Sequence, residues 1–259
     1  MRKSAFVFPF LSFAAGGAGL YLRYLELNTV FDPVTGLPEK NAPITLALIL
    51  LSAGIALFGT LFAVIASRKY TSRVEYERAF SPSGILYLAV FFILSAAMIA
   101  ADVMYFLSLK AVGSVAYINI VFIAFVAFSA LSLFILARAA YRGRGGKEMY
   151  VFSIIPSVFF CFWLIILYRQ NASNPVLLDY CYQCLALASA ALSFYYGAGF
   201  AFKKSKPAKT IISYFLTIYF CMIVLVDNII LPFKIIFAVI VIAQLINSVQ
   251  FIKNLKRKA

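Results

Sequence analysis

Histidine is missing from all 259 residues of this chain. Histidine is a common ligand of catalytic zinc, the usual axial ligand of haem and the general base of serine hydrolase triads, so its absence removes these kinds of site. Any chemistry must therefore use carboxylates, lysine, tyrosine, cysteine or the backbone. We expect neither a metal ion nor a cofactor.

Charged residues are scarce as well. They make up 12% of the chain, against about 25% in a soluble domain, while hydrophobic residues make up 64%. A water-soluble fold of this length could not cover so much apolar surface, so the lipid bilayer is the expected solvent and partner. We expect one membrane domain over 1–259 and no soluble domain.

Apolar runs long enough to cross a membrane occur eight times. A helix needs about 20 apolar residues to span the hydrocarbon core. The predicted spans are 4–25, 44–67, 84–108, 115–137, 149–168, 177–202, 210–231 and 233–252. The sequence therefore predicts an all-α integral membrane protein with eight transmembrane helices.

Basic residues alternate with these spans. Of the 23 lysines and arginines, 18 lie in the terminal or connecting segments on one side of the membrane, which therefore faces the cytoplasm together with both termini. The formal charge is +15 on this side and −1 on the other. The net charge of +14 thus reflects membrane topology, and we expect no nucleic-acid partner. The predicted location is the cytoplasmic membrane, crossed several times.

Cysteine is used four times. Cys181 and Cys184 have the Cys-x-x-Cys spacing of a redox pair near the outer end of the sixth span. Cysteine is also a common small apolar residue in membrane helices, and Cys161 and Cys221 lie deep inside their spans. We favour packing over thiol chemistry.

The even number of spans suggests two halves, 1–148 and 149–259, with four spans each. Aligning them places Asp102 opposite Asp227, each near the outer end of an otherwise apolar span. Such a duplication would be a parallel repeat with its axis along the membrane normal.

Charged side chains near the outer ends of the spans form the candidate site. A charge costs about 2.5–3.5 kcal/mol at the bilayer centre, so a charge inside a span is a functional candidate by default. The candidate residues of this outer layer are Asp102, Asp227, Asp179, Arg169, Lys234, Arg23, Glu26 and Tyr105. They would either line an outward-facing pocket for a small-molecule or lipid ligand or form salt bridges between helix ends.

Gln244 and Asn247 form a polar face midway along the last span. Amides at this depth must find hydrogen-bond partners, so the face points into the bundle. Two interpretations stay open, namely hydrogen bonds that join helices and the lining of a solute path.

Three stretches carry a resemblance to a known family. They read FDPVTGLP (31–38), FWLIILYRQNASNPVLLDY (162–180) and FYYGAGFAF (194–202). They resemble an uncharacterised family of multi-pass membrane proteins from anaerobic Gram-positive bacteria. The resemblance implies a bacterial cytoplasmic membrane and no particular activity.

A smaller set of residues is similar to the eight-span lysoplasmalogenase-like family, which hydrolyses ether lipids. The similar residues are Asp102 in the third span, Asp227 in the seventh, and Ala243-Gln244-Leu245-Ile246 in the last. The similarity implies a lipid hydrolase whose two carboxylates act as general acid and base. The histidine that follows the first aspartate of that family is missing here.

These patterns leave three hypotheses. The first is a small-solute transporter or permease-like protein with a charged outer pocket, the second a non-catalytic membrane subunit or sensor of a larger complex, and the third the lipid hydrolase. We favour the transporter, and hence a protein that is not an enzyme.

Overall fold

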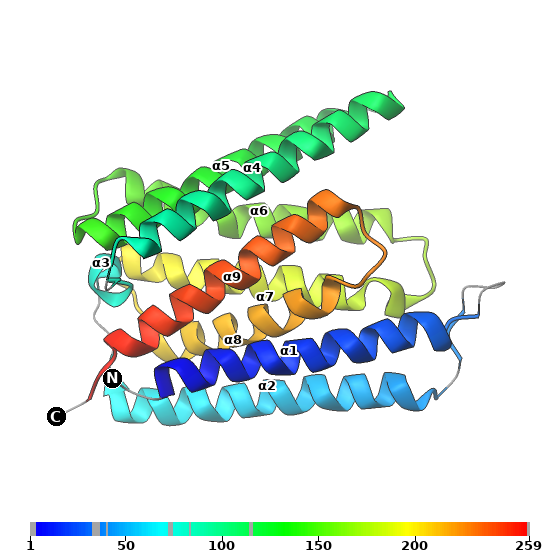
Figure 1. The fold of residues 1–259 in the computed structure, drawn as a ribbon, viewed down its shortest axis with the longest axis horizontal. Coiled ribbons are helices and arrows are strands. Elements are labelled where there is room, and N and C mark those ends of the chain that lie inside the picture. Colours follow the sequence, from blue (N-terminus) through cyan, green and yellow to red (C-terminus); the bar gives the residue numbers. More distant parts are fainter. Residues whose placement is uncertain are drawn as a thin grey trace.

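The apolar runs fold into long helices that lie side by side (Figure 1). The computed structural model describes residues 4–32, 37–39, 41–71, 75–82, 84–113 and 116–257. Within them the helices are α1 (Ser4–Thr29), α2 (Pro43–Lys69), α3 (Tyr76–Ala79), α4 (Leu86–Val112), α5 (Tyr117–Arg142), α6 (Glu148–Gln170), α7 (Cys181–Ala201), α8 (Pro207–Val224) and α9 (Leu231–Asn254). A 3-10 turn, η1 (Leu177–Asp179), precedes α7, and β1 (Tyr70–Thr71) pairs with β2 (Lys256–Arg257) in an antiparallel ladder.

Seven of the described helices, α2 and α4 to α9, are long and apolar enough to cross a membrane. The prediction of an all-α, multi-pass membrane protein is therefore confirmed. The first predicted span lies in α1, which has 26 residues but contains Arg23 and Glu26 and is not among the seven. Eight crossings stay a prediction.

The two ends of the helix bundle differ in charge. α1 begins and α9 ends at the same end, where the connections α2–α4, α5–α6 and α7–α8 also lie (Figure 1). We call this the inner end, and the opposite one the outer end. The described parts of the basic segments gather at the inner end, as the charge pattern predicts. Which side of a membrane the inner end faces stays a prediction.

Several helix boundaries differ from the predicted spans, and two of these differences move a candidate aspartate out of its span. The seventh span is predicted to reach 231, but α8 ends at Val224. Asp227 and Asn228 favour a turn, and Pro232 stands in the first turn of α9, so a new helix starts there. The sixth span is predicted from 177, but α7 starts at Cys181 after η1. Asp179 and Asp227 therefore lie in connecting segments, outside the spanning helices.

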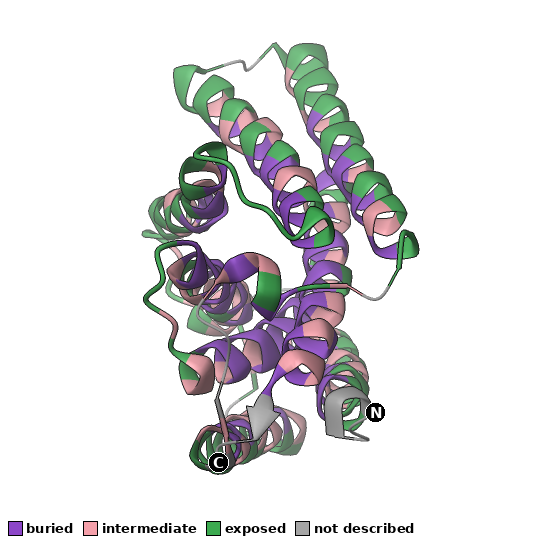
Figure 2. Ribbon diagram, turned by 90° about the vertical axis from the view of Figure 1, so that its left-hand side faces the viewer, coloured by how far each residue is buried: buried purple, intermediate pink, exposed green. Residues whose placement is uncertain are grey.

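α8 lies at the centre of the bundle and packs against α1, α2, α7 and α9. In the apolar segments of α8 and α9, 67% of the residues are buried by protein, compared with 22% in α2. Viewed along the bundle, the buried residues face inward and the exposed ones lie on the outer surfaces of the helices (Figure 2). These outer surfaces are apolar, so lipid is their natural solvent.

Two glycines allow α1 to lie close to α8. A Cβ atom at Gly16 would stand 2.8 Å from Met222 Cβ, and one at Gly19 would stand 2.9 Å from Ile223. Small residues at such crossings let two helix backbones approach closely and gain dispersion contact. This contact aligns the outer end of α1 with the turn that follows α8.

The packing does not have the symmetry that the proposed repeat predicts. α7 packs along α8, whereas the corresponding helices of the first half, α2 and α4, have no comparable contact within the described residues. α8 and α9 lie between α2 and α4 instead, because α2 packs on α8 and α4 packs on α9. Duplication of the sequence stays a prediction.

α4 and α5 form a hairpin that leaves the bundle toward the outer end (Figure 1). Asp102 is the last buried residue of α4, and residues 103–112 are exposed or half-buried. Phe122 is the first buried residue of α5. The hairpin is therefore packed along its inner part only.

Candidate functional site

A cleft of about 910 Å³ opens at the outer end, with walls from α1, α4, α5, α6, α7 and α9. Half of its polar lining residues come from the segment between α6 and α7 and from the α8–α9 turn, and the others from the helix ends. The polar residues are Arg23, Tyr105, Asn119, Arg169, Gln170, Asn171, Asn174, Asp179, Tyr180, Gln183, Asp227 and Asn228. The remaining lining residues are apolar. The cleft is thus amphipathic.

Aromatic rings form the deeper part of the cleft. The ring of Trp163 lies 5.0 Å from Phe233, 5.0 Å from Phe237 and 5.4 Å from Phe122, measured between centroids. Tyr105 extends this layer, with its ring 5.1 Å from Phe233. Rings at these separations attract one another and hold a fixed surface. A ligand in the cleft would meet amides and charges near the rim and aromatic faces below.

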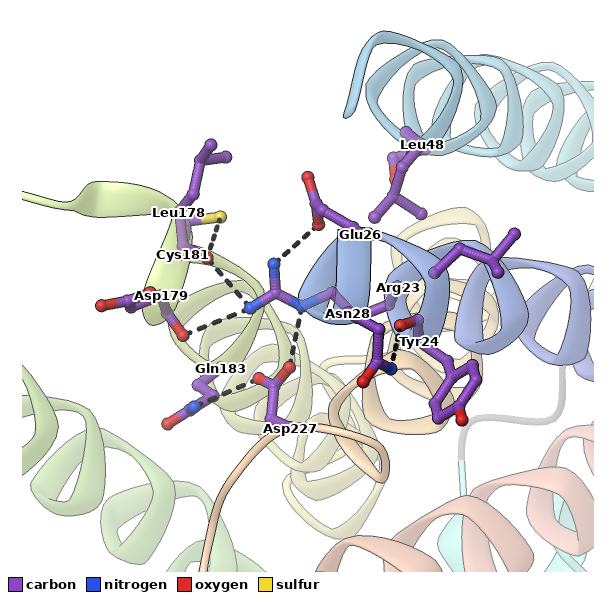
Figure 3. A network of polar contacts seen from close by, with 12 residues as sticks. Arg23, Tyr24, Glu26, Asn28, Leu48, Leu178, Asp179, Cys181, Gln183 and Asp227 are labelled. Carbon is purple, nitrogen blue, oxygen red and sulfur yellow. Dashed lines mark hydrogen bonds and ion pairs between the residues drawn. The ribbon is translucent and has the colours of Figure 1, made fainter. Parts of the chain in front are cut away.

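Arg23 organises one wall of the cleft (Figure 3). Its Nε donates to Asp227 Oδ1 at 2.8 Å, and its Nη1 donates to Glu26 Oε2 at 2.7 Å. Its Nη2 donates to the carbonyl oxygens of Leu178, at 3.0 Å, and Asp179, at 3.3 Å. The Arg23 side chain is fully buried, at 0% exposure. One guanidinium thus ties α1 to the segment before α7 and to the α8–α9 turn.

Asp227 is held from two sides. Besides the ion pair with Arg23, its Oδ2 accepts a hydrogen bond from Gln183 Nε2 at 3.1 Å. Burial raises the pKa of Asp227 above its usual range, while Arg23 and Gln183 oppose this shift by stabilising the ionised form. Glu26 keeps one oxygen, Oε1, buried without a hydrogen-bond partner among the described residues. The Arg23 cluster therefore holds two carboxylates with one cation.

The structure brings five of the eight predicted outer residues together in the cleft. Arg23, Asp179, Asp227, Arg169 and Tyr105 line it, and Glu26 supports it through Arg23. Asp102, Lys234, Gln244 and Asn247 are not among its lining residues. The outer end therefore contains both a pocket and salt bridges, the two interpretations that the sequence leaves open.

Asp102 lies apart from Asp227. It is 5% exposed, and its Oδ1 has no hydrogen-bond partner among the described residues. α4 packs against α5 and α9, whereas Asp227 follows α8. Within the described chain no hydrogen bond or ion pair joins the two carboxylates. The acid–base role that the lysoplasmalogenase-like similarity implies for the two carboxylates stays a prediction.

The mid-depth amides join helices. Gln244 Nε2 donates to Ser193 Oγ of α7 at 3.1 Å, and Tyr87 of α4 donates to Asn247 Oδ1 at 3.1 Å. These bonds link α9 to two neighbours, as the helix-joining interpretation predicts. A void of about 20 Å³ lies beside them, and Gln244 Oε1 has no partner among the described residues.

Several residues that line the cleft are not predicted from the sequence. Trp163, Phe233 and Phe237 look like ordinary core aromatics in a sequence that is 17% aromatic. Gln183 and Asn228 carry no charge and so did not stand out. A signal was present in the amides of the segment QNASNP (170–175), which gather at one point of an otherwise apolar sequence.

Comparison with known proteins does not assign this chain to a family. No family model, no curated protein and no solved structure matches this chain. The resemblance to an uncharacterised bacterial family stays a prediction, and function has to be inferred from the cleft.

Proposed function

We propose that this protein is a small-solute transporter whose outer cleft binds a zwitterionic organic solute with an apolar side group. The cleft is the observation that carries this proposal. Its volume of about 910 Å³ falls in the usual range of small-molecule sites, roughly 300–1,000 Å³. Its amphipathic lining suits a solute with one polar and one apolar end.

The charges at the rim favour a zwitterion. Arg23 and Asp227 neutralise each other, whereas Arg169 is exposed and forms no ion pair within the described residues. Among the described residues, the carboxylate of Asp179 accepts one hydrogen bond from a neutral donor, the Asn174 amide at 3.0 Å, and forms no ion pair. Arg169 and Asp179 therefore offer opposite charges to a ligand, and the aromatic layer offers a surface to its apolar group.

The rest of the bundle suits an outward-open state. The cleft reaches the aromatic layer, and helices α7, α8 and α9 have the largest buried shares of the seven candidate spans. Alternating access would require these inner contacts to open while the outer cleft closes.

Solute binding can be measured without a label, because Trp163 is the only tryptophan of the chain and lies on the cleft wall. We expect amino acids with apolar side chains to change its fluorescence saturably in detergent or nanodiscs. Arg169→Gln should weaken binding about tenfold, since it removes a charge-assisted contact of roughly 1.4 kcal/mol. Arg144→Gln, an exposed arginine near the inner end, is the matched control and should bind normally.

Uptake into proteoliposomes then separates a transporter from a sensor. Saturable binding with uptake that Arg169→Gln slows at low solute concentration supports the proposal. Binding without uptake would favour the sensor or subunit hypothesis. No fluorescence change across amino acids, short peptides and betaines, from a protein with native helix content, would exclude the cleft as a zwitterion site.

A further inference from the structure

Of the three buried acidic side chains among the described residues, Glu26 and Asp227 form ion pairs with Arg23, and Asp102 forms none. Asp102 is 5% exposed, and its Oδ1 has no hydrogen-bond partner within the described chain. No lysine or arginine forms an ion pair with it among the described residues. Asp102 lies within α4, one of the seven helices that can cross a membrane. A carboxylate in this position is largely shielded from solvent and has no ion-pair partner to compensate for the lost hydration.

Such a carboxyl group is most stable when it carries a proton. Desolvation penalises the charged form of an acid, and at membrane depth there is no water to restore it. A neutral carboxylic acid needs far less compensation than a carboxylate. The surroundings of Asp102 therefore favour proton binding over ionisation.

The neighbouring elements bring no charge close to Asp102. On α4 the nearest titratable group is Tyr105, and Tyr87 and Lys110 lie near the two helix ends. α5, which packs on α4, has no charged or other titratable residue between Tyr117 and Arg138. α9, which also packs on α4, has none between Lys234 and Lys253. A proton is thus the smallest ligand that can neutralise Asp102.

The position of Asp102 connects it to the cleft. Tyr105 follows three residues later on the same face of α4, about one helical turn toward the outer end, and lines the cleft. Beyond Asp102, α4 leaves the bundle, and its residues 103–112 are exposed or half-buried. Asp102 therefore lies about one helical turn below Tyr105 and the aromatic layer, where water entering from the outer end would meet a buried acid that has no counter-charge.

We propose that Asp102 is a membrane-embedded proton-binding site that exchanges its proton through the outer cleft and couples proton movement to solute transport. The coupling rests on the proposed transport function, whereas the proton site does not. Ionised Asp102 would draw water down beside Tyr105 and hold the α4–α5 hairpin away from the bundle. Protonated Asp102 would let the hairpin pack.

Reaction with dicyclohexylcarbodiimide tests the proton site directly. This apolar reagent adds to protonated carboxyl groups in membrane interiors, and the adduct stays on the side chain. With the full chain in lipid nanodiscs, peptide mass spectrometry should find one carbodiimide on the peptide that contains Asp102. Labelling should fall as the pH rises, because the reaction needs the protonated carboxyl group and the ionised carboxylate is unreactive.

Two variants make this result specific. Asp102→Asn should abolish the adduct, while Asp179→Asn, which changes a half-buried carboxylate outside the spans, should leave it unchanged. A water-soluble carbodiimide should label Asp102 far less than the apolar one. Absence of the adduct at Asp102 under conditions that label a reference proton-translocating protein would overturn the proposal, and so would labelling that does not change with pH.

Coupling is tested separately in proteoliposomes that carry a pH gradient. Asp102→Asn should bind the solute with wild-type affinity, by Trp163 fluorescence, yet lose gradient-driven accumulation. If Arg169→Gln lost solute binding but Asp102 was still labelled normally, the result would bear on the solute site in the cleft and would not contradict the proton site. Gradient-driven accumulation that survives Asp102→Asn would refute coupling, even if Asp102 is labelled.

Discussion

Asp227 and Asp102 are both buried acids toward the outer end of the bundle, yet their surroundings are opposite. Asp227 accepts bonds from Arg23 and Gln183, which come from two different helices. Asp102 is reached by no cation, and one of its oxygens has no partner within the described chain. Burial raises the energetic penalty of both charges, but only Asp227 has groups that offset it.

The difference follows from how α1 and α4 pack. α1 lies against α8 through Gly16 and Gly19, and this brings Arg23 to the turn that holds Asp227. α4 meets α5 and α9, whose charged residues lie near their ends. A paired acid of this kind is part of the structure, whereas an unpaired one is free to exchange its proton. The following substitutions test that distinction.

Removing the cation should have the largest effect. Arg23→Ala leaves Asp227 and Glu26 buried without a counter-charge, which should cost about 3–5 kcal/mol of unfolding free energy. Thermal unfolding in detergent measures this loss. Arg78→Ala is the matched control, because Arg78 pairs with Glu75 on the surface, at 65% and 43% exposure, and should change stability by less than about 1 kcal/mol. Equal effects of the two variants would mean that the Arg23 cluster is not structural.

A methyl group between α1 and α8 should have an intermediate effect. Gly16→Ala places a Cβ 2.8 Å from Met222 Cβ and should cost about 1–3 kcal/mol as the helices move apart. Gly17→Ala meets nothing within 4 Å and should be neutral or stabilising by up to about 1 kcal/mol. Thermal unfolding of the Gly16→Ala and Gly17→Ala variants measures the difference in stability. If Gly16→Ala were as stable as Gly17→Ala, close packing would not be what positions Arg23.

Replacing the unpaired acid should have the smallest effect. Asp102→Asn removes no ion pair and should change the unfolding free energy by no more than about 1 kcal/mol. As the pH rises, the wild type should lose stability relative to this variant, because ionising a buried acid costs free energy and the amide does not ionise. Asp227→Asn removes the charge that faces Arg23 and should cost about 1–3 kcal/mol at neutral pH. Unfolding measured at two pH values tests both variants. A larger loss in Asp102→Asn than in Asp227→Asn would reverse the roles assigned to them.

The sequence predicted the fold class well and the site in part. Long apolar runs predict helices in lipid, and each helix from α2 onward, apart from the short α3, overlaps one predicted span, with boundaries that differ by up to seven residues at the end of α8. The outer position of Arg23, Asp179 and Asp227 was also predictable, because charges avoid the membrane interior. The aromatic layer around Trp163 was not, since packing and ligand-binding aromatics look alike in a sequence.

What the sequence determined by itself is the partition of the chain between lipid and water. That property depends on the order of apolar and basic residues and needs no knowledge of which helices touch. Only the tertiary structure decided which charges are neutralised, because Arg23 and Asp227 are 204 residues apart and meet through the packing of α1 on α8. The two aspartates align in a sequence comparison of the halves, and the different neighbours of α4 and α8 give one a cation and leave the other without any.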